Sequence, residues 1–168
     1  MNKQYLIKLD TESQFAYVEK SIPPTLKNMP GYSTERLEKL VPILLERIHV
    51  GVDIEEASET GEYDFAFSTP NYETELLKWK NDPDVALVKP RLIQVISILN
   101  DANWESPETL KSALMPYAEE IGKGEVFWPL RVALSGKAQS PDPFTIAYII
   151  GKEETLLRIK LACDKING

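Results

Sequence analysis

The stretch GEVFWPLRVALSGKAQSPDPF, residues 124–144, has the features of a helix, a stop, a polar loop and a second helix start. Three apolar residues recur at spacings of three and four on one side of the first helix: Phe127, Leu130 and Leu134. Gly136 follows the last of them, where a glycine commonly ends a helix. Asp142 and Pro143 then supply an N-cap and a first-turn residue. The stretch therefore predicts two helices joined by a short loop.

Arg131 lies on the same apolar side of the first predicted helix. A charged group among apolar residues must reach out to solvent, form an ion pair or meet a ligand. An ion pair with a nearby Asp or Glu is one interpretation. The other is a planar guanidinium aimed at a nucleic-acid base edge or a phosphate. The loop that follows favours the second, because a helix start can attract an anion and Lys137 adds positive charge.

The rest of the chain shows helical signals of the same kind. Ser33 and Ser106 are placed as N-caps, and Thr11 is expected to cap a first short helix. Apolar periodicity predicts further helices in five more segments: 34–50, 72–80, 83–102, 108–122 and 152–166. The nearest approach to a strand pattern is YDFAF, which is short. The fold class expected is all-α.

Two consecutive helical subdomains are predicted, with the boundary in an acidic segment. Half of the residues in DIEEASETGEYD, Asp53 to Asp64, are acidic. This composition is typical of a solvated helix turn and a linker. We therefore expect one subdomain over residues 1–64 and a second over residues 65–168.

Composition narrows the possible functions. The formal net charge of −7 argues against indiscriminate nucleic-acid binding. The charge is uneven, since residues 122–168 hold seven Lys and Arg against five Asp and Glu. One Cys and one His cannot form a metal site of those residues. Cys163 is expected in the core, and His49 is expected to be solvated or to interact with a helix end.

Catalytic signatures are absent from the sequence. There is no glycine-rich phosphate loop, no nucleophile elbow and no spaced carboxylate pair. No apolar run approaches the roughly 20 residues that a membrane span needs. We expect no catalytic residue, no metal and no cofactor in this chain, no membrane association, and a cytoplasmic location.

At this point the residues resemble a known family, the glutamate–tRNA ligases. Five short elements match the pattern near the C-terminus of that family, with similar spacing: Pro129 to Arg131, Ala133 to Gly136, Ser140 to Pro141, Ile150 to Glu153, and Arg158 to Ile159. The segments MNKQYLIKL and LVPILLERIHVGVDIEEA resemble family segments more loosely. The family's two nucleotide-binding signatures are missing. The resemblance therefore implies the anticodon-binding region alone, a fragment that lacks the ATP- and Mg-using catalytic part.

The resemblance also implies roles for individual residues. Arg47 matches a family arginine that contacts the third anticodon base, and Arg131 matches one that lines the anticodon pocket. A family segment that packs against the first two anticodon bases corresponds to three residues here: Ser140, Pro141 and Pro143. The implied partners are the tRNA anticodon loop and the catalytic domain of the same polypeptide, with a monomeric state expected. A helical protein-interaction module with the same fold is the alternative, and it would leave Arg47 and Arg131 in ion pairs.

Overall fold

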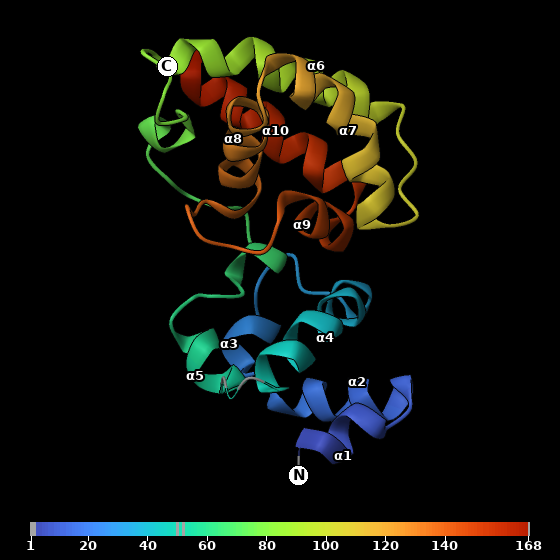
Figure 1. Ribbon diagram of the computed structural model, residues 1–168. Helices are drawn as coiled ribbons and strands as arrows, with labels where there is room; N and C mark the ends of the chain where they lie inside the picture. The colour runs from blue at the N-terminus through green and yellow to red at the C-terminus, as the bar shows by residue number, and fades with distance from the viewer. Residues whose placement is uncertain (1–2, 50, 52, 168) are drawn as a thin grey trace. The chain divides into compact units, whose positions relative to one another are not determined.

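The computed structural model describes residues 3–49, 51 and 53–167. The side chains of Lys3, Gln4, Ile7, His49 and Asn167 lie outside the description, so the expectation for His49 has no structural counterpart. The described residues form ten α-helices and three short 3-10 helices, labelled η1 to η3, and no strand (Figure 1). The all-α prediction is therefore confirmed. The chain divides into two compact units, one ending at Ser68 and the other beginning at Thr69.

The first unit is built around the longest of its helices. Its elements are α1 (Lys3–Lys8), α2 (Thr11–Ser21), α3 (Pro24–Lys27), α4 (Thr34–His49), α5 (Ile54–Glu59) and η1 (Asp64–Ala66). The predicted apolar stripe of α4 forms the centre of the core, since Leu37, Leu40 and Leu44 are fully buried. Helices α1, α2 and α5 pack against α4. The Ser33 hydroxyl accepts a hydrogen bond from the Arg36 amide at 3.2 Å, as expected of an N-cap.

Two local expectations for the first unit are wrong. Asp10, and not Thr11, caps α2, because the Asp10 carboxylate accepts a hydrogen bond from the Ser13 amide at 2.8 Å. The acidic segment after α4 is not a solvated linker, since Ile54, Ala57 and Tyr63 are buried within it. Apolar positions hidden among the carboxylates are what tie this segment to the core.

Backbone contacts explain why the first unit extends to Ser68. The Gly31 amide donates to the Phe67 carbonyl at 2.7 Å, and the Arg36 guanidinium donates to the Ala66 carbonyl at 3.2 Å. The Tyr32 and Phe67 rings lie 5.1 Å apart. Residues just beyond the expected boundary at position 64 thus belong to the core of the first unit.

The second unit is a bundle in which the last helix contacts most of the others. Its elements are η2 (Thr74–Leu77), η3 (Val85–Leu87), α6 (Val88–Asn100), α7 (Pro107–Ile121), α8 (Lys123–Ser135), α9 (Pro143–Ile150) and α10 (Lys152–Asn167). Helix α10 packs against α6, α8 and α9, as can be followed in Figure 1. Ser106 caps α7 with a reciprocal bond to Thr109, as its position predicted, and Gly122 follows the end of that helix.

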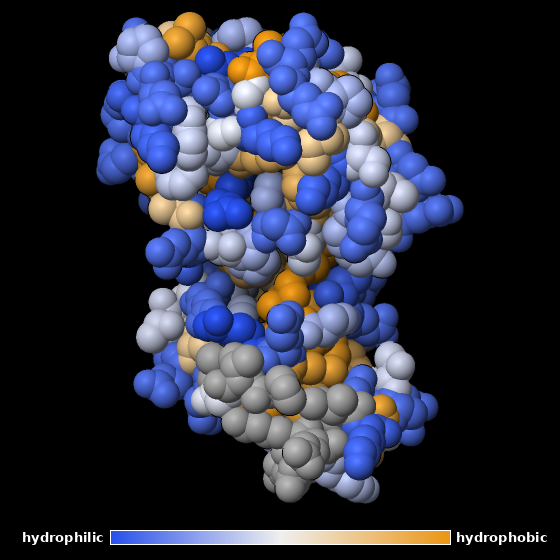
Figure 2. Space-filling view, viewed as in Figure 1, coloured by the Kyte–Doolittle hydropathy of each residue, from blue (hydrophilic) through white to orange (hydrophobic). Residues whose placement is uncertain are grey.

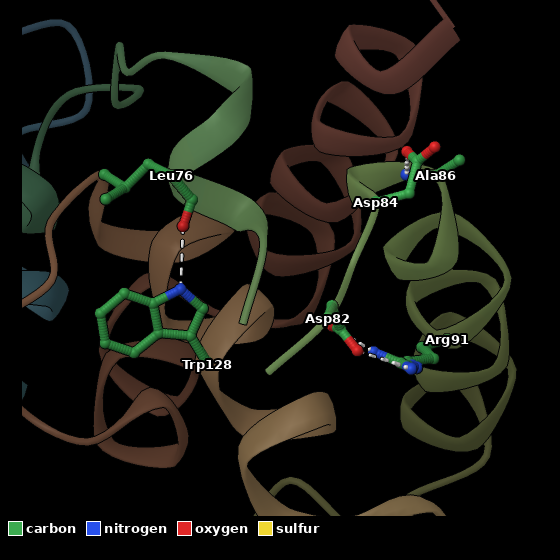
Figure 3. Close-up of polar contacts among 6 residues, drawn as sticks. All are labelled: Leu76, Asp82, Asp84, Ala86, Arg91 and Trp128. Atoms are coloured by element: carbon green, nitrogen blue, oxygen red, sulfur yellow. Dashed lines mark hydrogen bonds and ion pairs between the residues drawn. The ribbon is translucent and has the colours of Figure 1, made fainter. Parts of the chain in front are cut away.

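Residues 69–87 are mostly irregular, although two helices were expected across 72–102. Polar side chains hold this segment to the bundle (Figure 3). The Trp128 indole donates to the Leu76 carbonyl at 2.8 Å. Arg91 donates to both carboxylate oxygens of Asp82, at 2.7 and 3.1 Å. The bond from Trp128 satisfies a backbone carbonyl that a helix would otherwise have paired internally.

The buried face of α10 is turned slightly from the one expected. Ile159 and Cys163 are buried as predicted, as are Leu130 and Leu134 of α8. Leu156 is only half-buried, and the polar residues Thr155 and Arg158 take fully buried positions instead. Within the described residues, no helix has both the length and the apolar character to cross a bilayer.

Candidate functional site

Arg131 sits in the last two turns of α8 with no polar partner for its side chain. Leu130 and Leu134 beside it are buried, and Arg131 itself is half-buried. No carboxylate or carbonyl among the described residues pairs with its guanidinium. The ion pair with a nearby acid, one of the two interpretations of Arg131, is therefore not formed among the described residues. The Arg131 guanidinium thus keeps its five N–H donors for a ligand or for solvent.

An aromatic pair lies one turn before Arg131. The rings of Phe127 in α8 and Phe144 in α9 meet edge to face with their centroids 5.0 Å apart. Phe127 is four residues before Arg131, so the two side chains are neighbours on the helix surface. A half-buried ring beside an unpaired guanidinium offers two flat groups on which an unstacked base can lie.

The loop after Arg131 leaves α8 through a fixed turn. Gly136 has φ +73° and ψ 11°, and its amide donates to the Val132 carbonyl at 2.7 Å. The Ser135 hydroxyl donates to the Arg131 carbonyl at 2.8 Å and accepts from the Lys137 amide at 3.1 Å. These bonds set the direction in which Lys137 and the rest of the loop leave the helix.

The remaining predicted site residues lie along this loop and the start of α9. Ser140 and Pro141 are half-buried, and the Ser140 hydroxyl donates to the Pro141 carbonyl at 2.8 Å. Pro143 is buried in the first turn of α9. The Asp142 carboxylate accepts from the Thr145 amide at 2.9 Å and from its hydroxyl at 2.7 Å. A carboxylate therefore already occupies the helix start that was expected to attract an anionic ligand.

Arg47 belongs to the first unit and is paired. Its guanidinium donates to the Glu62 carboxylate, and both side chains remain more than a third exposed. Beside this pair, the Nε of Arg47 and the hydroxyl of Tyr63 are buried without a hydrogen-bond partner among the described residues. Burial raises the pKa of Tyr63. The pair is the arrangement expected of a protein-interaction module, in contrast to Arg131.

The structure thus brings five of the six predicted residues to one junction. Arg131, Lys137, Ser140, Pro141 and Pro143 lie on α8, the α8–α9 loop and the first turn of α9. Arg47 lies at the end of α4, in the other unit. Figure 2 shows mainly hydrophilic side chains over the visible face of each unit.

Sequence reasoning missed Arg158 of α10 as a residue of this junction. Arg158 is 1% exposed, and its Nη1 donates to the Leu134 carbonyl at 2.7 Å. The only signal in the sequence was its place in the family pattern, because helical periodicity puts an arginine on a polar face by default.

Outside the junction, the described residues offer neither an activated thiol nor a cluster that could hold a metal ion. Cys163 is buried, and burial raises the pKa of its thiol, which disfavours the nucleophilic thiolate. Among the described residues, no group of three His, Cys, Asp or Glu side chains is placed to hold a metal ion.

Comparison with known proteins identifies families and relatives that resemble this chain. The family described as anticodon binding domain matches residues 13–163. A glutamate–tRNA ligase from Lachnoclostridium phytofermentans is 31% identical over 176 residues, covering 100% of this chain and 33% of that protein. The Flavobacterium johnsoniae glutamate–tRNA ligase is 34% identical over 169 residues, covering 98% of this chain and 31% of that protein. The chain thus spans about a third of the length of these relatives.

Solved structures show the same arrangement of helices. A glutamate tRNA ligase from Elizabethkingia meningosepticum, solved in complex with its amino acid, superposes with a TM-score of 0.70 at 24% identity. That alignment covers 97% of this chain and 31% of the other. The glutamate–tRNA synthetase of Elizabethkingia anophelis gives a TM-score of 0.69 at 25% identity, over 96% of this chain and 30% of that one. With a family match that runs through most of both units, the chain belongs to the anticodon binding domain family, as found in glutamate–tRNA ligases.

Proposed function

We propose that this chain binds the anticodon loop of a transfer RNA as part of a glutamate–tRNA ligase. At the α8–α9 junction, Arg131 lines the anticodon pocket and Lys137 adds positive charge. Ser140, Pro141 and Pro143 pack against the first two anticodon bases. Arg47 of the first unit provides a donor for the third base. The bases of a single-stranded loop can be splayed out and read in this way by stacking and by hydrogen bonds to their edges.

The unpaired guanidinium of Arg131 is the observation that carries this proposal. A partly buried arginine with no partner in the chain must interact with water or with a ligand. A base edge or a phosphate would supply that interaction through two parallel hydrogen bonds. An adaptor surface would have no need to keep this residue unpaired.

The whole protein, in this proposal, attaches glutamate to its tRNA at the expense of ATP, with Mg in the catalytic part. This chain contributes recognition, and it does not activate glutamate by itself. The catalytic domain is then a partner within the same polypeptide, which acts as a monomer in the cytoplasm.

The test is binding of a stem–loop RNA that carries the anticodon of glutamate tRNA. Arg131→Gln keeps a polar side chain but removes the charge and the fork of donors. Loss of one bidentate base contact costs about 1–3 kcal/mol, so we expect the dissociation constant to rise roughly 5- to 150-fold. Titration followed by fluorescence anisotropy of labelled RNA measures it.

A matched control removes the same charge from an exposed position on another helix. Lys111 is exposed on α7, and Lys111→Gln should leave binding nearly unchanged. The proposal fails if the unmodified chain binds the anticodon stem–loop no better than a stem–loop with an unrelated loop sequence. It also fails if the Arg131 and Lys111 variants weaken binding equally.

A further inference from the structure

Helix α10 buries two polar side chains on the face that it presents to the other helices. Thr155 is 0% exposed and Arg158 is 1% exposed, and they are three residues apart, so they are neighbours on one side of α10. A fully buried arginine is costly unless its donors are satisfied. The hydrogen-bond partners of Thr155 and Arg158 therefore indicate why these two polar side chains are buried.

Each of the two side chains binds a carbonyl near the end of a different helix. Arg158 donates through Nη1 to the Leu134 carbonyl of α8 at 2.7 Å, and Thr155 donates to the Ala147 carbonyl of α9 at 3.3 Å. The last carbonyls of a helix have no partner within it, and a cation such as Arg158 is favoured there by the helix dipole. The Ala147 carbonyl also accepts from the Gly151 amide at 2.9 Å, so Thr155 adds a second bond to it. Helix α10 thus holds the ends of both helices that flank the loop.

The guanidinium of Arg158 is itself held in place. Its Nε donates to the Glu154 carboxylate at 3.0 Å, one turn earlier in α10. The carboxylate balances the buried charge and fixes the plane of the guanidinium. With 1% exposure, Arg158 does not present its donors to RNA, in contrast to Arg131.

The point that Arg158 binds lies directly before the loop. Leu134 is the residue before Ser135, and Ser135 carries the hydrogen bonds that direct Lys137. Gly136 then turns the chain in the left-handed region. A shift of the Leu134 carbonyl would therefore move every residue from Ser135 to Pro141.

We propose that Arg158 is a positioning residue. From its buried position on α10, it fixes the geometry in which the α8–α9 loop meets RNA. This inference rests on the proposed function, because the loop is argued to contact the anticodon. Arg158 acts through the Leu134 carbonyl and does not touch the ligand. Loss of this bond leaves the loop folded in several positions, of which only some fit the RNA.

The experiment compares three variants of the whole chain. Arg158→Met keeps most of the side-chain volume and removes all donors. Arg158→Lys keeps the charge and one donor. Ile159→Ala is the control, since Ile159 is equally buried on the same helix. Its side chain has no polar atom that could form a hydrogen bond to α8. All are studied at a temperature at which circular dichroism shows each of them folded.

Two measurements are made on each variant. The first is the dissociation constant for the anticodon stem–loop RNA. The second is hydrogen exchange at the amides of residues 135–140, measured without RNA. We expect Arg158→Met to weaken binding about tenfold, which corresponds to one hydrogen bond to a charged group, and to speed exchange in the loop. Arg158→Lys should recover part of both, and Ile159→Ala should leave both near the unmodified values.

The outcomes separate this inference from the function on which it rests. Equal RNA binding by Arg158→Met and Ile159→Ala, at equal loss of melting temperature, would overturn the positioning role. If Arg158→Met does not fold, the same comparison is made with Arg158→Lys, and loop exchange identical to that of the control would overturn it. A third outcome is that Arg158→Met speeds hydrogen exchange in the loop but the unmodified chain shows no preference for the anticodon RNA. That outcome would overturn the proposed function, and it would still support the role of Arg158 in fixing the loop.

Discussion

At the scale of single residues, the two arginines expected to read RNA differ in what they contact. Arg131 is without a partner among the described residues, whereas Arg47 donates to Glu62. Both Arg47 and Glu62 stay more than a third exposed, so water and salt screen the pair and its stabilising effect is small. A ligand of modest affinity can therefore displace the carboxylate. In the proposed function, RNA must therefore compete with Glu62 for Arg47.

This competition leads to a prediction for Glu62→Gln. Removing the carboxylate frees the guanidinium, and an exposed pair is worth about 0–1 kcal/mol, so binding of the anticodon stem–loop should become up to about fivefold tighter. Isothermal titration of the variant against the same RNA measures the change. Glu59→Gln removes the same charge from an exposed position on α5 and serves as the control. An identical gain in both variants would mean that general repulsion, and not release of Arg47, is responsible.

At the scale of elements, the turn between α8 and the loop depends on a glycine for two reasons. Gly136 has φ +73°, which a residue with a Cβ adopts at a cost. A Cβ added there would also lie 2.8 Å from the Cβ of Pro70. Pro70 belongs to a segment that α10 holds, since the Lys165 ammonium donates to the Tyr72 carbonyl at 3.3 Å and lies 4.9 Å from the Tyr72 ring centroid. Burial there raises the pKa of Tyr72 to about 12.

Gly136→Ala should therefore lower the stability of the second unit by about 2–4 kcal/mol, as the sum of backbone strain and overpacking. Chemical denaturation followed by circular dichroism measures the loss. Gly61→Ala is a useful comparison, because Gly61 has φ +84° but its added Cβ would meet only the movable Asp64 carboxylate, at 3.1 Å. That variant should lose only about 1–2 kcal/mol. Equal losses at the two sites would show that the contact with Pro70 is unimportant.

The elements also show which parts of the structure a sequence reveals. Residues 106–151 were predicted well because their signals are local: an N-cap beside its helix, a proline in a first turn, a glycine after a last turn. Residues 53–64 and 72–87 were predicted poorly because their structure depends on distant partners. Trp128 binds the Leu76 carbonyl from 52 residues away, and Arg36 binds Ala66 from 30 residues away. Arg158 was missed for the same reason, since its partner carbonyl is 24 residues away.

At the scale of the whole molecule, the charge balance limits how RNA can be held. The chain carries a net charge of −7, and at most three cations are proposed at the RNA: Arg47, Arg131 and Lys137. Each phosphate neutralised on a single strand contributes a slope of about −0.7 to the dependence of log affinity on log salt. We therefore expect an overall slope no steeper than about −2, measured by repeating the stem–loop titration over a range of salt concentrations. A slope of about −4 would instead mean that further basic residues follow the RNA backbone.

The positions of the tryptophans make their fluorescence a probe of the second unit alone. All three tryptophans, Trp79, Trp104 and Trp128, follow residue 69, and Trp128 stands one helical turn before Arg131. Tryptophan emission, excited at wavelengths that tyrosine does not absorb, therefore does not report on the first unit, including Arg47. A titration read through emission reports occupancy at the α8–α9 junction, while labelled RNA reports occupancy anywhere. Divergence between the two curves would reveal RNA that has engaged the first unit before the second.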